Sequence, residues 1–132
     1  MSDYLLVVDD NAGVRCLLFE ILSHEGYNVE MAANGLEALR KVSIRVPSLI
    51  ILDAKMPGMS GLETLEELKK LAPNVPVIII TAYTELDAVI EAQKCGMVMY
   101  HLRKPFDIDD IRNLVRSIMA KETNDDQKPK AN

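Results

Sequence analysis

Short apolar segments recur along the chain and alternate with amphipathic ones. The segments Leu5–Val8, Leu49–Leu52 and Val77–Ile80 contain only aliphatic residues. A continuous apolar run of this kind is typical of a strand that is buried on both faces, as in a parallel sheet. Val29–Ala32 and Met97–Leu102 match less well and are interpreted as two further strands. The pattern therefore predicts a sheet of five strands.

The apolar period becomes helical between these strands. The first such segment is followed by Gly26, which can end a helix. Its apolar positions, which fall on one face of a helix, are Val14, Leu17, Leu18, Ile21 and Leu22. A second helix is predicted to start at Asn34, because Glu37 follows it at the spacing of a capped helix start. The apolar positions of this second helix are Leu36, Leu39 and Val42.

Three more helices are predicted in the second half of the chain. The first ends before Pro73, the second spans Glu85–Lys94, and Asp107 can cap the third. The first is marked by the apolar positions Leu62, Leu65, Leu68 and Leu71. The last is expected to face the core with Ile108, Ile111, Leu114, Val115 and Ile118. Strands and helices thus alternate in five βα units. This order predicts an α/β fold, an open parallel sheet with helices on both faces.

The length of the chain, 132 residues, is that of one domain. We expect the ordered domain to cover residues 1–120. Residues 121–132 are polar apart from alanine at position 131, and they are predicted to form a disordered tail. Such a segment cannot bury enough apolar surface to offset the entropy that ordering costs.

Charge and composition exclude several classes of function. The 15 basic and 20 acidic residues give a net charge of −5, which disfavours nucleic acid as a partner. No apolar run approaches the roughly 20 residues that span a bilayer, and the first residues lack the pattern of a signal peptide. Cys16 and Cys95 form no metal-binding or CxxC pattern. We therefore expect a cytoplasmic protein with no membrane or nucleic-acid partner.

Polar residues directly follow the predicted strands. They are Asp9, Asp10, Asp53, Thr81 and Lys104. Ligands of open α/β sheets bind beyond the carboxyl ends of the strands, so we expect these side chains to gather at one edge. Each residue taken alone is equally well explained as a turn residue or a helix cap. Their joint occurrence at strand ends favours a functional site.

Three carboxylates in one site repel each other unless a cation lies among them. Mg²⁺ suits them because it takes hard oxygen ligands and keeps several waters, whereas zinc prefers His or Cys. A metal site beside a hydroxyl and a lysine is typical of phosphoryl chemistry, in which an Asp can be the nucleophile. Asp53 is the stronger candidate for that role, since Asp9 and Asp10 form the adjacent pair that can hold the metal.

These residues lie in motifs that resemble the receiver domain of two-component response regulators. The motifs are Val7-Val8-Asp9-Asp10, Leu52–Gly61, Thr81-Ala82 and Lys104-Pro105-Phe106, within a resemblance that runs from Tyr4 to about Met119. The resemblance implies a flavodoxin-like (CheY-like) doubly wound fold. Its sheet has five parallel strands in the order 2-1-3-4-5, and five helices cover it.

The resemblance also implies a role for each site residue. Asp53 is implied as the phosphoacceptor, and Thr81 and Lys104 as groups that contact its phosphoryl group. The ligands implied for Mg²⁺, for which Mn²⁺ can substitute, are Asp9, Asp10, Asp53 and the Lys55 carbonyl. Such a protein is a phosphotransfer intermediate that catalyses its own phosphorylation, and it is not a conventional turnover enzyme.

The segment before Lys104 departs from the family pattern. Gly96 and Lys104 are one residue further apart than in the family. The switch aromatic of the family therefore maps to Tyr100 when counted from Gly96, and to His101 when counted back from Lys104. We favour His101, since related relay regulators have a histidine at this place.

A narrower resemblance is to the single-domain phosphorelay regulators of spore-forming bacteria. It rests on Gly26-Tyr27, Ala32–Leu36, Thr81–Tyr83 with Glu85–Asp87, and Lys104–Asp109. It implies a monomer that takes a phosphoryl group from a sensor histidine kinase and passes it to a histidine phosphotransferase, as in the initiation of sporulation. We also expect an aspartyl-phosphate phosphatase as a partner. The residues that we expect to bind partners are Asn11, Gly13, Val14, Arg15, Leu17, Pro57, Tyr83, Pro105 and Phe106.

Other functions share some of these features. A stand-alone receiver of the chemotaxis type has the same site chemistry and signals by binding a partner when phosphorylated. A further alternative is a receiver fragment of a longer transcription factor, in which the polar tail is a linker. A flavin-binding electron carrier needs a phosphate-binding loop, and Asp9 and Asp10 would repel that phosphate. A haloacid-dehalogenase-type phosphatase needs a second Asp where this chain has Lys55.

Overall fold

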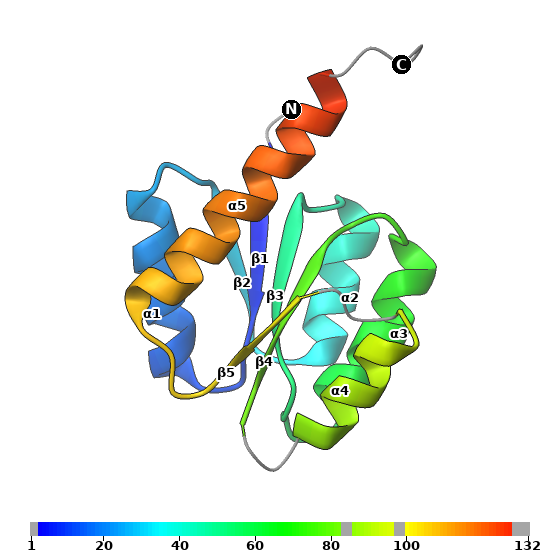
Figure 1. The fold of residues 1–132 in the computed structure, drawn as a ribbon. Helices are drawn as coiled ribbons and strands as arrows, with labels where there is room; N and C mark the ends of the chain where they lie inside the picture. The colour runs from blue at the N-terminus through cyan, green and yellow to red at the C-terminus, as the bar shows by residue number, and fades with distance from the viewer. Residues whose placement is uncertain (1–2, 83–85, 97–99, 128–132) are drawn as a thin grey trace.

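Strands and helices alternate along the chain in the computed structural model, which describes residues 3–82, 86–96 and 100–127 (Figure 1). The strands are β1 (Leu5–Val8), β2 (Val29–Ala32), β3 (Leu49–Asp53), β4 (Val77–Thr81) and β5 (Tyr100–Arg103). The helices are α1 (Ala12–His24), α2 (Gly35–Ile44), α3 (Gly61–Leu71), α4 (Leu86–Lys94) and α5 (Ile108–Gln127). The βα alternation predicted from the apolar pattern is confirmed.

The strands form one parallel sheet in the order β2-β1-β3-β4-β5. This is the doubly wound order that the family resemblance implied. β1 lies between β2 and β3, so the winding of the chain changes direction beside β1. Val8 is the partner of Leu52 in β3, which brings the ends of β1 and β3 level. The acids Asp9 and Asp53 therefore start at the same edge of the sheet.

Alternate residues of each strand face opposite sides of the sheet. In β1, Leu6 and Val8 belong to the core that α2, α3 and α4 cover, whereas Leu5 and Val7 belong to the core under α1 and α5. Figure 1 shows the two groups of helices on either side of the sheet. Because both faces are covered, every position of the central strands β1, β3 and β4 is buried, and this explains their uninterrupted apolar runs.

Side-chain caps fix where α2 and α3 begin. The Asn34 side chain accepts a hydrogen bond from the Glu37 N–H at 2.8 Å, as the sequence predicted. At α3, the Ser60 hydroxyl accepts from the Glu63 N–H, and the Glu63 carboxylate accepts from the Ser60 N–H. This reciprocal capping box determines the start of the helix that follows the loop after β3.

Some apolar helix positions are exposed, and one of them, Ile108, was expected to face the core. These positions are Leu17, Leu36, Leu71 and Ile108, and their side chains are 45% to 64% exposed. Leu36, Leu71 and Ile108 lie in the terminal turns of their helices. Leu17 lies about 100° around α1 from the buried Leu18, at the rim of the apolar stripe.

α5 continues through residues 121–127, where the sequence predicted the start of a tail. Extending an existing helix costs less than starting one, so a polar segment can follow a packed helix without a core of its own. Figure 1 shows the last turns of α5 projecting beyond the sheet. The domain boundary at residue 120 and the disorder of residues 128–132, which lie outside the described residues, stay predictions. Neither α5 nor any other helix in the described ranges combines the length and apolar character needed to cross a membrane.

Candidate functional site

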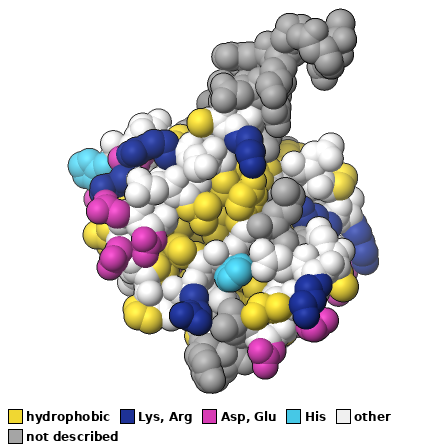
Figure 2. Space-filling model, viewed as in Figure 1, with side chains coloured by type: hydrophobic (Ala, Val, Ile, Leu, Met, Phe, Trp, Pro, Cys, Tyr) yellow, Lys and Arg dark blue, Asp and Glu magenta, His cyan; other side chains and the backbone are white. Residues whose placement is uncertain are grey.

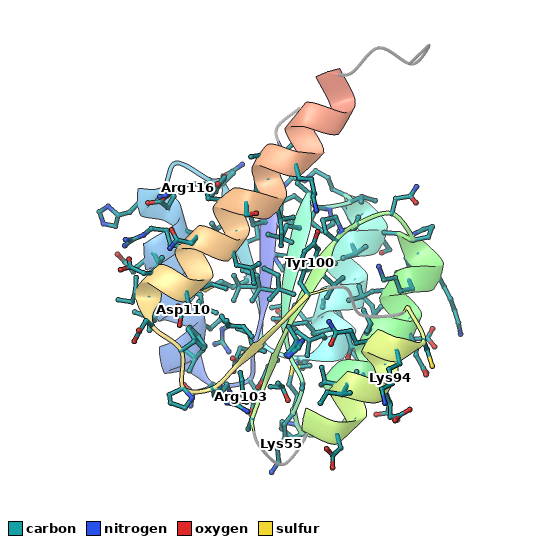
Figure 3. All side chains as sticks on the ribbon, in the orientation of Figure 1. Lys55, Lys94, Tyr100, Arg103, Asp110 and Arg116 are labelled. Atoms are coloured by element: carbon teal, nitrogen blue, oxygen red, sulfur yellow. The ribbon has the colours of Figure 1, made fainter. Side chains whose placement is uncertain are left out.

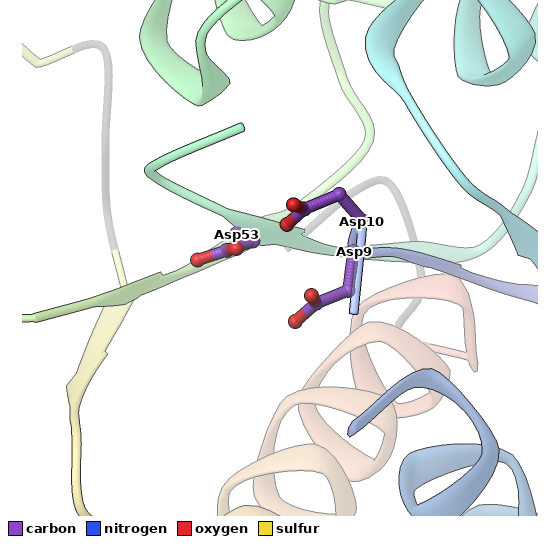
Figure 4. A group of neighbouring side chains, drawn as sticks. All are labelled: Asp9, Asp10 and Asp53. Atoms are coloured by element: carbon purple, nitrogen blue, oxygen red, sulfur yellow. The ribbon is translucent and has the colours of Figure 1, made fainter. Parts of the chain in front are cut away.

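Three carboxylates meet where β1 and β3 end. Asp53 is the last residue of β3, and Asp9 and Asp10 follow β1 directly. One carboxylate oxygen from each residue lies within 4.8 Å of the others (Figure 4). Asp9 and Asp53 are buried, and Asp10 is exposed. The fold thus brings together the three acids that the strand ends suggested.

Neighbouring groups contact the two buried carboxylates. Asp9 Oδ1 accepts a hydrogen bond from the Asn11 N–H at 2.9 Å. Asp53 Oδ1 lies 3.4 Å from Lys104 Nζ and 3.5 Å from the backbone nitrogen of Lys55. The Lys55 side chain is exposed at this end of the sheet (Figure 3). The other oxygen of Asp9, Oδ2, is buried and has no hydrogen-bond partner among the described residues. A buried unpaired carboxylate oxygen is costly, and a cation would satisfy it.

Burial raises the pKa of both enclosed acids. For Asp53, desolvation is the largest cause of the raised pKa and the Asp9 carboxylate adds to it, whereas the Lys104 ammonium opposes it. For Asp9, desolvation is again the largest cause, and the Asn11 N–H and the charges of Lys104 and Arg15 oppose it. A bound cation stabilises the ionised forms and so lowers both pKa values. The all-oxygen donor set fits a hard divalent cation.

Thr81 and Lys104 lie at the ends of the neighbouring strands β4 and β5. Thr81 is buried, and its hydroxyl donates to the Ala82 carbonyl at 3.0 Å. The Thr81 carbonyl accepts from the Lys104 N–H at 2.8 Å, which ties the two strand ends together. The Lys104–Pro105 peptide bond is cis. Lys104 therefore reaches Asp53 from a main chain that is fixed against β4.

The register of β5 separates the two candidates for the switch aromatic. Tyr100, labelled in Figure 3, packs with Leu102 against the core under α1 and α5. His101 occupies the alternate position and therefore faces the α4 side of the sheet. Tyr100 and His101, the two alternatives for the switch aromatic, thus lie on opposite faces of the sheet. Figure 2 shows hydrophobic side chains gathered in a strip beside α5, at the edge that β5 forms.

The residues predicted to bind partners lie in different environments. Asn11 caps α1 by accepting from the Val14 N–H at 3.0 Å, and the Arg15 guanidinium donates to the Asp9 carbonyl at 2.7 Å. Val14 and Phe106 are half-buried against the core under α1 and α5. The remaining candidates are Gly13, Leu17, Pro57 and Pro105, which are exposed, and Tyr83, which lies outside the described residues.

Two contacts near this site were not predicted from the sequence. The Gly61 N–H donates to the Ala54 carbonyl at 3.0 Å, and a Cβ on Gly61 would lie 2.2 Å from the Asp53 carbonyl oxygen. The missing side chain therefore lets α3 begin against the end of β3. A glycine at a helix start is the only sequence signal for this approach, and it is weak. No sequence signal places Arg15 on the Asp9 carbonyl.

Comparisons with known proteins relate the chain to a large family. Residues 5–116 match the family model of the response regulator receiver domain. The chain is 45% identical over 124 residues to the sporulation initiation phosphotransferase F of Bacillus subtilis (strain 168). The aligned residues cover 94% of this chain and 99% of that protein. It is 41% identical over 116 residues to the transcriptional regulatory protein ZraR of Klebsiella oxytoca. Here the aligned residues cover 88% of this chain and 26% of that protein.

A solved structure of similar fold is the response regulator receiver domain protein from Clostridium thermocellum. It has a TM-score of 0.84 and 30% sequence identity, over 92% of this chain and 97% of that one. This chain covers almost all of the first relative but only about a quarter of the second, so the receiver domain is the part that the two relatives share. This chain belongs to the response regulator receiver domain family, which acts in two-component signalling.

Proposed function

We propose that this chain accepts a phosphoryl group on Asp53 from a sensor histidine kinase and relays it to a histidine phosphotransferase. The observation that carries the proposal is the cluster of Asp9, Asp10 and Asp53 at the ends of β1 and β3. The identity of 45% over 94% of the chain to the sporulation phosphotransferase supports a relay, with the initiation of sporulation as the process. The protein acts as a cytoplasmic monomer, and an aspartyl-phosphate phosphatase is a further partner.

Mg²⁺ is the cofactor in this proposal, with Mn²⁺ as a substitute. Asp9, Asp10 and Asp53 would hold it together with the Lys55 carbonyl. All of these ligands are oxygens, and the buried Asp9 Oδ2 has no other partner among the described residues. When bound, the metal neutralises charge on the phosphoryl oxygens during transfer.

Asp53 is the nucleophile. Its carboxylate attacks the phosphorus in line with the P–N bond of a phosphohistidine, and an acyl phosphate forms while the bonding electron pair leaves with the imidazole nitrogen. Lys104, which is 3.4 Å from Asp53 Oδ1, then pairs with a phosphoryl oxygen. Thr81 turns its hydroxyl from the Ala82 carbonyl to the same group. His101, on the α4 side of β5, is the switch residue.

The substitution Asp53→Asn is expected to abolish phosphorylation, because an amide oxygen is a poor nucleophile and forms no stable acyl phosphate. The protein is incubated with acetyl phosphate and Mg²⁺, and its intact mass is measured. The wild type should gain one phosphoryl group with Mg²⁺ and none with a chelator. Circular dichroism checks that the variant is folded. A folded wild type that stays unmodified with Mg²⁺, or a variant that is still modified, would contradict the assignment.

In this proposal, the kinase and the phosphotransferase dock on α1, next to the acids. Gly13 leaves the approach to the site open, and Leu17 exposes 46% of its surface. Leu17→Ala is expected to slow phosphoryl transfer between proteins by roughly tenfold, the effect of losing about 1.4 kcal/mol of contact. Leu36→Ala on α2 is the matched control, because it removes an exposed leucine elsewhere. Equal transfer rates for the two variants would place the docking surface elsewhere.

A further inference from the structure

We propose that Arg15 is a positioning residue of the metal site, which acts through the main chain between Asp9 and Asp10. The inference rests on the proposed function, since it takes these two acids as metal ligands. Arg15 lies in the first turns of α1, and its Nη1 donates to the Asp9 backbone carbonyl at 2.7 Å. The residue is half-buried, and this hydrogen bond directs its guanidinium towards the end of β1.

The contact fixes the peptide plane between the two acids. The carbonyl of Asp9 and the N–H of Asp10 belong to one planar trans peptide and point in opposite directions. A guanidinium that holds the carbonyl therefore also sets the direction of the Asp10 N–H, and with it the path of the chain at Asp10. Asp10 is exposed, so packing does little to hold it. Arg15 thus restrains the acid of the cluster that packing restrains least.

Further hydrogen bonds close the same loop. The Asn11 N–H donates to Asp9 Oδ1 at 2.9 Å, and the Asn11 side chain accepts from the Val14 N–H at 3.0 Å. The Arg15 N–H donates to the Asn11 carbonyl, also at 3.0 Å. Arg15 therefore takes part through both its main chain and its side chain. These bonds hold the turn from β1 to α1 on both sides of Asp10.

The charge of Arg15 alone would have the opposite effect on metal binding. A guanidinium near the site repels a divalent cation, so the loss of its charge alone would tighten Mg²⁺ binding. The loss of a positioning contact weakens binding, because groups that orient metal ligands typically contribute about 10- to 100-fold to affinity. A residue that only docks a protein partner leaves the affinity for Mg²⁺ unchanged. The three roles therefore predict three different results.

The experiment measures the affinity for Mg²⁺ alone, by titration followed in proton–nitrogen correlation spectra. Arg15→Met keeps the aliphatic stem and removes the guanidinium, and Arg15→Lys keeps the charge and one donor group. Arg40→Met makes the same change of net charge at an exposed position on α2 and is the control. We expect Arg15→Met to raise the Kd for Mg²⁺ roughly tenfold and to shift the Asp10 amide signal before any metal is added. Arg15→Lys should recover part of the affinity, and Arg40→Met should match the wild type.

A wild-type or tighter Kd in Arg15→Met would overturn the proposal. If the spectrum of Arg15→Met shows an unfolded chain, Arg15→Lys decides, because it preserves the charge. Weaker Mg²⁺ binding by a folded Arg15→Lys supports positioning, and a wild-type Kd overturns it. Failure of the proposed function has a different signature, since it appears in the wild type as absent Mg²⁺ binding or as binding without phosphorylation.

Discussion

Gly61→Ala is expected to lower the free energy of unfolding by about 3 kcal/mol or more, although alanine has a higher helix propensity than glycine. Gly61 is the first residue of α3. A Cβ there would lie 2.2 Å from the Asp53 carbonyl oxygen and 2.6 Å from the Ala54 Cα. Both are main-chain atoms, which cannot swing aside as the end of a flexible side chain can. Either α3 or the end of β3 must move, and the second movement displaces the proposed phosphoacceptor.

Gly13→Ala is the matched control for this prediction. Gly13 also lies in the first turn of a helix, but the nearest atom to a Cβ there is the side-chain oxygen of Asn11, at 3.2 Å. We expect this variant to remain within about 1 kcal/mol of the wild type. Urea denaturation measures both free energies of unfolding. Similar losses in the two variants would show that the close approach to β3 does not determine the effect.

Asp9→Asn is expected to stabilise the protein in the absence of metal. Burial raises the pKa of Asp9, so the native state keeps this proton to a higher pH than the unfolded chain does. The stability of the wild type therefore falls as the pH rises from the ordinary value of 3.8 through the raised native pKa. Asparagine stays neutral and keeps an acceptor for the Asn11 N–H. Above this pH range, we expect the variant to be more stable by about 1–2 kcal/mol.

Mg²⁺ should reverse this order of stability. A ligand that binds only the native state stabilises it by about 2.7 kcal/mol at 100 times its Kd. The wild type should gain this stabilisation, and Asp9→Asn should gain much less because it lacks one carboxylate ligand. Thermal denaturation with Mg²⁺ and with a chelator, at acidic and neutral pH, measures both effects. Equal Mg²⁺-dependent rises in Tm for the two proteins would contradict the role of Asp9 as a ligand.

The strands were predictable because burial on both faces leaves a strong signal in the sequence. β1 coincides with its apolar run, and β3 and β4 each extend one residue further, into Asp53 and Thr81. The order of the strands could not come from periodicity, since strands of the same pattern are interchangeable, and it came from the family resemblance. The helix faces were less predictable at their ends. Periodicity places Leu36 and Ile108 on a stripe but does not report that the terminal turns leave them exposed.

The acidic cluster was also predictable, because each acid follows an apolar strand and parallel strands end at one edge. The choice between Tyr100 and His101 was not, since counts from the two flanking motifs disagree. Strand register separates the two residues in space. The contact of Arg15 with the Asp9 carbonyl depends on how one loop folds back on itself, and no spacing in the sequence encodes that.

The relay is tested most directly by following one phosphoryl group through Asp53. A sensor kinase from the same organism is allowed to phosphorylate itself with radioactive ATP, and its label is transferred to this protein. The kinase and the nucleotide are removed, and a histidine phosphotransferase from that organism is added. We predict that the label passes to the phosphotransferase, and that Asp53→Asn never acquires it. Label that stays on the protein, or leaves only as inorganic phosphate at the same rate without the phosphotransferase, would contradict the relay.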